Sequence, residues 1–433
     1  MKTARTTWCV VALLAGACLE LWNPASAEAC SDPAPIYAQQ AVYSDDAARV
    51  TAIEKLRTMG PKGLQSLAKI HADLLPLVSQ PAAVGKTTWP GKADPNNVAR
   101  LREALDQVAQ QRGAAGSLLY WYTDLETAKQ EAHRSGRPIL SLRLLGKLTD
   151  EQSCANSRFF RTVLYTNREV ADKLRESFVL HWSSERPVPV ITVDFGDGRV
   201  LKRTMMGNSA HYVLDASGRP VDVVPGLYGP KAFLKAVGQA AIVAQEVSPL
   251  SDTVAAGKLV EFHRARLKAS KAAWTADLVK AGGPNLNQVG GSLRAATTEE
   301  LWTKIAMLHA DDAKLDDASK LLVRSERPNG PPASAAMRLA VGKRMVETPM
   351  LQAAQAALQF EQNVAIDTMR NEYLLHSTVH AWFARGDTTL DFARLNRRVY
   401  AELFLTPASD PWMGLAPPVY TGLEGAGLGV SAR

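Results

Sequence analysis

The sequence contains few cysteines, and this scarcity limits how the fold can be stabilised. Four occur among 433 residues: Cys9, Cys18, Cys30 and Cys154. Domains held together by disulfides need several bridges, so a disulfide framework is excluded as the main source of stability. Apolar residues make up 46% of the chain and charged residues 21%, a balance typical of globular proteins. We therefore expect a hydrophobic core to stabilise the fold.

Beyond its N-terminus the chain also lacks long hydrophobic runs and runs of basic residues. No later segment has the roughly 18 uninterrupted apolar residues that a membrane-spanning helix needs. The formal net charge is +7, but the Lys and Arg residues are scattered among acidic neighbours. Such a distribution favours solubility and does not form the basic patch that nucleic-acid binding requires. We predict neither a transmembrane segment after the N-terminus nor a nucleic-acid partner.

The N-terminus has the order of a secretory signal peptide. Two basic residues precede the apolar run "WCVVALLAGACLEL", and Ala25 and Ala27 then form an A-x-A pattern before Glu28. We predict a signal peptide at 1–27 and a secreted or periplasmic location, where disulfides can persist. An alternative is lipoprotein processing at Cys18, because small residues precede this thiol in "AGAC".

The periodic segments divide the remaining chain into four regions. Apolar residues recur at helical spacing in residues 44–76, where "MGPKG" separates two helices, and a third helix is predicted near 97–111. Strands and helices alternate in the middle third, which includes a strand at 139–145 and a hairpin turning at "GDG". This alternation indicates an α/β sheet of mixed direction, whereas the chain beyond about residue 250 has helical patterns. We predict an N-terminal helical region at 28–112, an α/β domain at 113–246, a C-terminal helical domain at 247–405 and a Pro/Gly-rich tail at 406–433.

Three stretches of the middle third carry a resemblance to a known family. They are "YWYTDLETAKQEAHRSGRPILSL", "SCANSRFFRTVLYTNREVADKLRESFVLHW" and "GNSAHYVLDASGRPVDVVPGLY", within about residues 118–245. In element order and spacing they are similar to the spermatogenesis-associated, thioredoxin-like family. The resemblance implies a thioredoxin-like α/β central domain, flanked here by N-terminal helices and a C-terminal all-α domain.

The resemblance also implies where a thiol site would lie. When the sequences are aligned on "NREVADKLRESFV", the family's Cys-x-x-Cys pair falls on Cys154 and Ser157, so this chain has Cys-x-x-Ser. The family's Gly-Trp-Pro, whose proline packs against the thiols, falls on "GNS", where Ser209 replaces the proline. Cys154, Ser157 and Ser209 are therefore the candidate catalytic residues, and no cofactor is implied.

The missing second thiol limits the chemistry of this site. In a thioredoxin-type pair the first thiolate attacks a substrate disulfide, and the second thiol resolves the mixed disulfide. A helix N-terminus beside Cys154 would favour its thiolate, to which Ser157 would donate a hydrogen bond. The leading interpretation is a binding or folding-assistance module for a protein partner or client polypeptide. The alternatives are a single-thiol disulfide exchange or isomerase enzyme that uses Cys154, and a helical interaction scaffold.

Cys154 itself has three open interpretations. It is a reactive thiol, a buried cysteine without a chemical role, or the disulfide partner of Cys30. His211 lies near the Ser209 position and could neighbour Cys154 and raise its reactivity. A half-buried strand histidine is the simpler interpretation of His211, as it is of His181.

A second candidate cluster lies in "NEYLLHSTVH". Glu372, His376 and His380 are spaced by four and would share one helix face, where the two histidines could bind a zinc ion. The stretch lacks the H-E-x-x-H pattern, and two ligands with an unknown third are a weak metal signature. We therefore predict ordinary hydrogen bonds for these histidines and no metal.

One aromatic residue lies close to the C-terminal end. Trp412 occurs in "SDPWMGL", a Pro/Gly setting in which an indole could dock a ligand or partner. More often such a side chain anchors a tail onto its own domain, which is our prediction for Trp412.

Overall fold

The structure, a computed structural model, is a mixed α/β arrangement with many helices. It describes residues 32–79, 94–283, 298–317, 319–320, 349–386 and 391–415. The predicted signal peptide, Cys30 and most of the predicted tail lie outside these residues. None of the helices described combines the length and hydropathy that crossing a membrane requires.

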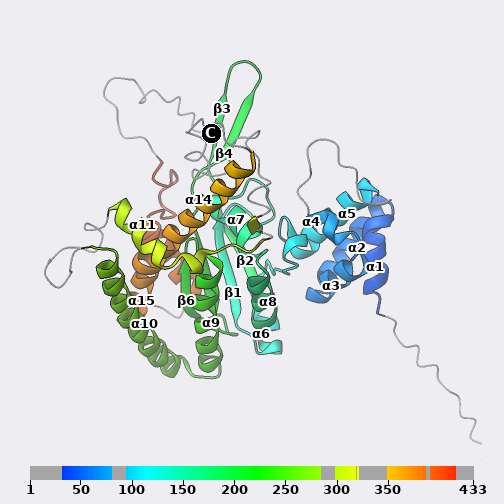
Figure 1. Cartoon of the computed structure of the whole chain (residues 1–433). Helices are drawn as coiled ribbons and strands as arrows, with labels where there is room; N and C mark the ends of the chain where they lie inside the picture. Colours follow the sequence, from blue (N-terminus) through cyan, green and yellow to red (C-terminus); the bar gives the residue numbers. More distant parts are fainter. Residues whose placement is uncertain are drawn as a thin grey trace, which may run out of the picture. The chain divides into compact units, whose positions relative to one another are not determined.

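The N-terminal helices are packed around a core of their own (Figure 1). Their apolar residues recur at helical spacing, so that one face of each helix is buried. The predicted helix pair and the third helix are confirmed. They are α1 (Ala34–Tyr43), α2 (Asp46–Thr58), α3 (Pro61–Ile70), α4 (Leu75–Ser79) and α5 (Pro95–Ala109), followed by the 3-10 turn η1 (Ala114–Gly116).

The sheet has four strands in the order β2-β1-β5-β6. Strand β1 (Ile139–Leu145) pairs in parallel with β2 (Val179–Arg186) and antiparallel with β5 (Ser209–Leu214), which pairs antiparallel with β6 (Pro220–Pro225). All residues of β5 and β6 are buried, because helices cover the sheet. The predicted sheet of mixed direction is confirmed.

Helices precede β1, connect β1 to β2 and follow β6. The chain enters it through α6 (Leu125–Ser135), crosses from β1 to β2 through three helical segments, and leaves β6 through α9 (Pro230–Val247). The crossover segments are α7 (Ala155–Phe159), the π-helix η2 (Phe160–Leu164) and α8 (Arg168–Ser177).

Beyond α9 every described element is helical, as predicted. These elements share one hydrophobic core with the sheet, and polar contacts cross the same boundary. The Tyr212 hydroxyl donates to Asn396 Oδ1 at 2.8 Å, and the Gly229 backbone N–H donates to Thr368 Oγ1 at 2.8 Å. The elements are α10 (Asp252–Lys280), α11 (Glu299–Leu308), η3 (Ala310–Ala313), α14 (Pro349–Arg370), η4 (Asn371–His376), α15 (Ser377–Ala384), α16 (Phe392–Arg398) and η5 (Val399–Leu403).

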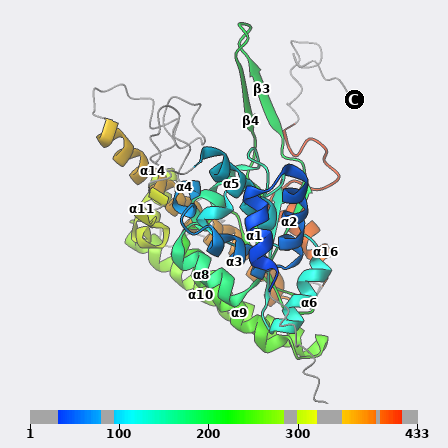
Figure 2. The ribbon, with the colours of Figure 1, turned by 90° about the vertical axis from the view of Figure 1, so that its right-hand side faces the viewer.

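A separate two-stranded hairpin extends from the end of β2. Its strands β3 (Val190–Asp194) and β4 (Val200–Thr204) pair antiparallel, as the sequence predicts. Gly196 and Gly198 have positive φ angles in the turn, where a Cβ atom would strain the backbone. Figures 1 and 2 show the hairpin projecting beyond the neighbouring elements.

Candidate functional site

Cys154 occupies the N-cap position of α7, directly after the loop that follows β1. Its Sγ accepts a hydrogen bond from the backbone N–H of Ser157 at 3.4 Å. The sequence predicted a bond from the Ser157 hydroxyl, but that oxygen is buried and has no hydrogen-bond partner among the described residues. The prediction is therefore corrected: the backbone of Ser157, and not its side chain, contacts the sulfur.

Burial dominates the chemistry of this thiol. Cys154 has 0% exposure and lies within the hydrophobic core of the sheet. Burial raises its pKa, against the opposing effect of the Ser157 backbone N–H. Among the described residues, Cys154 forms no disulfide. Cys30 lies outside the described residues, so the predicted Cys30 alternative remains a prediction.

The loop before β5 lies beside the first turn of α7. The backbone N–H of Ala155 donates to the Met206 carbonyl at 3.3 Å, and Asn156 Nδ2 donates to Ser209 Oγ at 3.0 Å. The structure thus brings Ser209 to the helix that begins at Cys154. The Ser209 hydroxyl contacts Asn156, a residue that the sequence analysis did not select.

His211 takes part in a buried pair with an aromatic residue. Its Nε2 lies 2.6 Å from the Tyr165 hydroxyl, and its ring is 4.7 Å from that of Phe160. Burial lowers the pKa of His211 to about 3, so the ring is neutral. No polar contact between His211 and Cys154 is recorded in the described part of the chain. The sequence predicted that His211 is a half-buried strand histidine, and the structure corrects this prediction, because the residue is fully buried.

His181 and Trp182 of β2 also have structural contacts. His181 Nδ1 lies 2.8 Å from Ser141 Oγ, and burial lowers its pKa to about 3. The Trp182 indole N–H donates to the Gln110 carbonyl at 2.8 Å. These contacts link β2 to β1 and to the N-terminal helical region.

The prediction for Trp412 is wrong. Its side chain is 53% exposed, whereas the adjacent Met413 is 4% exposed and belongs to the core. The apolar anchor at this point is therefore the methionine. The carbonyls of Thr406 and Asp410 accept hydrogen bonds from Arg186, which also hold this segment in place.

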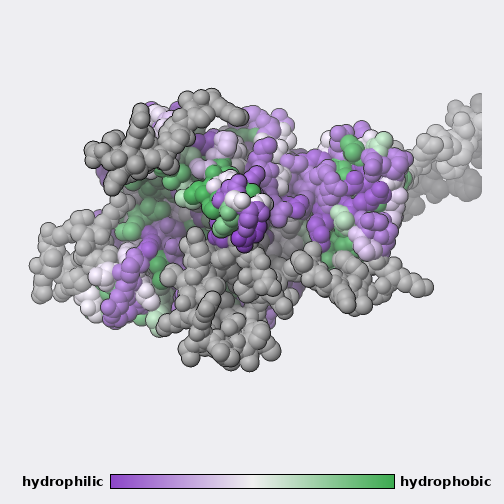
Figure 3. Space-filling model, turned by 90° about the horizontal axis from the view of Figure 1, so that it is seen from above, coloured by the Kyte–Doolittle hydropathy of each residue, from purple (hydrophilic) through white to green (hydrophobic). Residues whose placement is uncertain are grey.

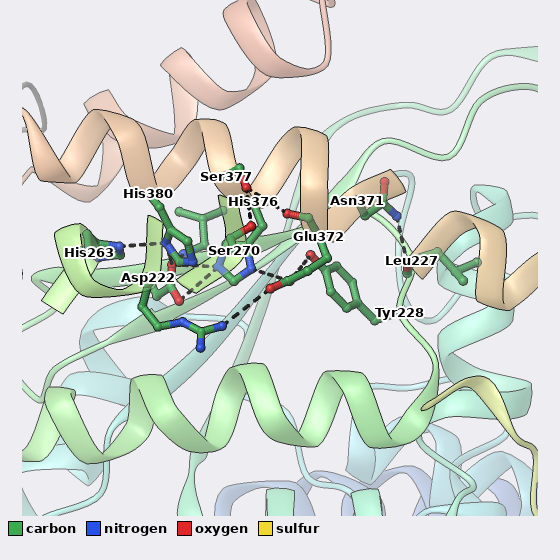
Figure 4. A network of polar contacts seen from close by, with 12 residues as sticks. Asp222, Leu227, Tyr228, His263, Ser270, Asn371, Glu372, His376, Ser377 and His380 are labelled. Carbon is green, nitrogen blue, oxygen red and sulfur yellow. Dashed lines mark hydrogen bonds and ion pairs between the residues drawn. The ribbon is translucent and has the colours of Figure 1, made fainter. Parts of the chain in front are cut away.

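A buried cluster of histidines and carboxylates lies between β6 and the C-terminal helices (Figure 4). His376 Nε2 lies 3.1 Å from both carboxylate oxygens of Asp222, and its Nδ1 lies 2.9 Å from Glu372 Oε2. His380 Nδ1 is 2.9 Å from His263 Nδ1 and 3.9 Å from Asp222 Oδ1. Four of these side chains are at most 2% exposed: Asp222, His263, His376 and His380.

Opposite charges balance one another inside this cluster. Burial opposes a charged imidazolium at His376, but the carboxylates of Asp222 and Glu372 outweigh it and raise the pKa of His376 to about 10. Burial lowers the pKa of His380, and the positive charge of His376 lowers it further. Burial also lowers the pKa of His263. His376 is thus a cation between two carboxylates, while the other two histidines are neutral.

The secondary structure places each member of the cluster. His376 is the last residue of the π-helix η4 and His380 lies one turn later in α15, so both rings face β6, as the spacing of four predicts. Glu372 is held by the Tyr228 hydroxyl at 3.2 Å and by Arg266 at 3.5 Å. The sequence thus correctly placed Glu372, His376 and His380 on one face.

Two members of the cluster were missed. Asp222 lies in the strand "PVDVVP", where a single carboxylate among apolar residues signals a buried charge that needs a partner. His263 lies in the long helix α10, and no sequence signal distinguishes it. Its Nε2 is 2.9 Å from the Val221 carbonyl, which fixes its ring against β6.

Comparisons with protein-family models, curated proteins and solved structures give no match for this chain. Its function is therefore inferred from the geometry described above.

Proposed function

We propose that the protein is a secreted or periplasmic binding module with a thioredoxin-like central domain that has lost dithiol chemistry. Three features support the fold assignment. A helix with a cysteine at its N-cap follows β1, a parallel strand follows that helix, and an antiparallel strand pair with a helix completes the region. Ser209, the first residue of β5, also contacts the cysteine-bearing helix through Asn156, as the resemblance implies.

The buried state of Cys154 supports the loss of catalysis. A thiol that attacks a disulfide must reach it as a thiolate, and the burial of Cys154 prevents access and raises its pKa. Ser157 cannot resolve a mixed disulfide, because a hydroxyl does not replace the second thiol in this exchange. These facts favour binding over the alternative single-thiol enzyme.

The observation that carries the binding function is the exposed β3–β4 hairpin. Five large apolar side chains of this hairpin are 41–53% exposed: Val190, Ile191, Val193, Phe195 and Val200. Exposed apolar side chains that cluster on one surface mark interaction sites. A two-stranded hairpin is only marginally stable by itself in water, so burial of these side chains by a partner would stabilise it. In Figure 3 hydrophobic and hydrophilic surface adjoin near the centre, where the hairpin points toward the viewer.

One face of the hairpin defines the chemistry of its partner. Side chains on alternate residues share a face, so Ile191, Val193 and Phe195 project together. Arg203 is paired with Ile191 across the hairpin, and the Arg199 guanidinium, which forms an ion pair with Asp197, lies 5.2 Å from the centre of the Phe195 ring. The face is therefore apolar with Arg203 as a basic group at its margin. We infer that it binds polypeptides that combine apolar and acidic residues.

Binding of a permanently unfolded, acidic model polypeptide tests this function. Val193→Asp places a negative charge at the centre of the face and should weaken binding by at least about tenfold, measured by fluorescence anisotropy. Ile242→Asp is the matched control, because Ile242 is 60% exposed on α9, outside the hairpin. Cys154→Ser should leave the affinity unchanged.

Two results would contradict the proposal. Equal affinities of the Val193→Asp and Ile242→Asp variants would show that the hairpin is not part of the binding surface. Loss of binding in a correctly folded Cys154→Ser variant would instead favour the single-thiol exchange enzyme.

A further inference from the structure

We propose that Asp222, His376 and His380 bind a single zinc ion. These residues offer ligand atoms that all lie within 4.8 Å of one another. They come from β6, η4 and α15. Carboxylate oxygen and imidazole nitrogen are ligands that zinc accepts in proteins.

Two separations between ligand atoms are close to those around a tetrahedral ion. Bonds of about 2.0–2.1 Å place neighbouring ligand atoms about 3.3 Å apart in a tetrahedron. Asp222 Oδ1 lies 3.1 Å from His376 Nε2 and 3.9 Å from His380 Nδ1.

A hydrogen bond to Glu372 orients the His376 ring for this role. Glu372 Oε2 accepts from His376 Nδ1 at 2.9 Å. When the ion takes the place of the proton on Nε2, this bond keeps the remaining proton on Nδ1 and leaves Nε2 to donate its electron pair to the ion. This arrangement of carboxylate or carbonyl, histidine and metal recurs in zinc sites, where it fixes the tautomer of the ligand.

His380 meets the rest of the cluster through Nδ1. Because His263 Nε2 donates to the Val221 carbonyl, its Nδ1 accepts a hydrogen bond from His380 Nδ1 at 2.9 Å. A zinc ion bound at His380 Nδ1 would take the place of this proton. His380 Nε2, which is buried, has no hydrogen-bond partner among the described residues, so His380 joins the network through Nδ1 alone.

Burial assigns the ion a structural role. All three ligands are almost completely buried, so a substrate cannot reach the ion, whereas catalytic zinc sites keep an open position. The ion would replace the proton between His376 Nε2 and Asp222. It would connect the sheet to η4 and α15 of the C-terminal region, and this role is separate from partner binding at the hairpin.

Metal analysis of the full chain tests this inference. After incubation with zinc and gel filtration, the unmodified protein should retain about one zinc ion per chain, as a single site requires. X-ray absorption at the zinc edge should show nitrogen or oxygen ligands at about 2.0–2.1 Å with scattering from imidazole rings. Chelation should lower the midpoint of thermal unfolding.

Three variants separate the site from adventitious binding. His380→Gln should lose the zinc, and Glu372→Gln should weaken zinc affinity by about 10–100-fold through loss of the orienting bond. His181→Gln is the matched control, because His181 is an equally buried histidine outside the cluster, and it should retain the zinc.

The unmodified chain tests the proposal even where a variant fails to fold. A folded unmodified chain that binds no stoichiometric zinc and unfolds at the same temperature with or without chelator would overturn the proposal. The cluster would then be a network held by protons, with His376 as a cation between Asp222 and Glu372. Bound zinc without imidazole scattering would overturn it equally, since it would place the ion elsewhere.

Discussion

At the residue scale, Cys154 shows that a favourable helix position does not by itself make a thiol reactive. A helix N-terminus stabilises an anion through its unpaired N–H groups, and the Ser157 N–H does contact the sulfur. Complete removal of the thiol from water disfavours the thiolate more strongly, so the pKa of Cys154 rises. The residue therefore acts as a small apolar side chain of the core.

The buried histidine His211 makes the stability dependent on pH. Burial lowers its pKa to about 3, against about 6.5 in an unfolded chain, so the unfolded state binds more protons between these values. Its contribution is complete above about pH 6.5, and below that pH it falls by about 1.4 kcal/mol per pH unit until about pH 3.

His211→Gln removes this titration while an amide remains opposite the Tyr165 hydroxyl. Denaturant unfolding between pH 6.5 and pH 4 should show a pH slope smaller by about 1.4 kcal/mol per unit in the variant. Identical slopes in the two proteins would mean that His211 is not held neutral by burial. Comparison at pH 8 gives the cost of the substitution without the titration.

At the scale of elements, the approach of α2 and α3 depends on a glycine. A Cβ atom at Gly63 would lie 2.0 Å from the Leu56 carbonyl oxygen, closer than any real contact permits. Because the obstacle is backbone, the two helices would have to move apart. The break at "MGPKG" therefore sets both the turn and the spacing of the pair.

Gly63→Ala should lower the free energy of unfolding by about 1–3 kcal/mol, as overpacking does in cores. Gly238→Ala is the matched control, since Gly238 lies in α9 and a Cβ atom there meets nothing within 4 Å. This control should be stabilised by about 0.5–1 kcal/mol, because alanine loses less backbone entropy in a helix. Chemical denaturation measures both, and equal effects would refute the close approach.

At the scale of the whole molecule, the sheet and the C-terminal helices depend on one another. They share a hydrophobic core, and Asp222 of the sheet finds its charged partner, His376, in a helical segment. A carboxylate buried without that partner would be strongly destabilising. We therefore expect the two regions to unfold together.

Truncation tests this dependence. A fragment of residues 113–246 should lack cooperative unfolding and dispersed amide signals in NMR spectra. A chain that begins at residue 113 and keeps the C-terminal region should remain folded, because the N-terminal helices have their own core. A well-folded 113–246 fragment would show instead that the central region is an independent domain.

Much of the secondary structure followed from the sequence, because helical and strand periodicities are local. The helix pair around "MGPKG", the strand at 139–145 and the "GDG" hairpin are each determined within a few neighbouring residues. The shared face of His376 and His380 follows in the same way from their spacing. The lack of a second thiol at position 157 was also evident.

Only the tertiary structure decided what these residues contact. Burial of Cys154, exposure of Trp412 and the arrival of Asp222 and His263 beside His376 all depend on packing between segments far apart in the chain. Asp222 and His376 are separated by 154 positions, and no local pattern encodes such a contact. The sequence by itself determined the elements and the chemical groups on them. Because burial and partners arise only when these elements pack, the fold determined which thiol is shielded and which histidines meet a carboxylate.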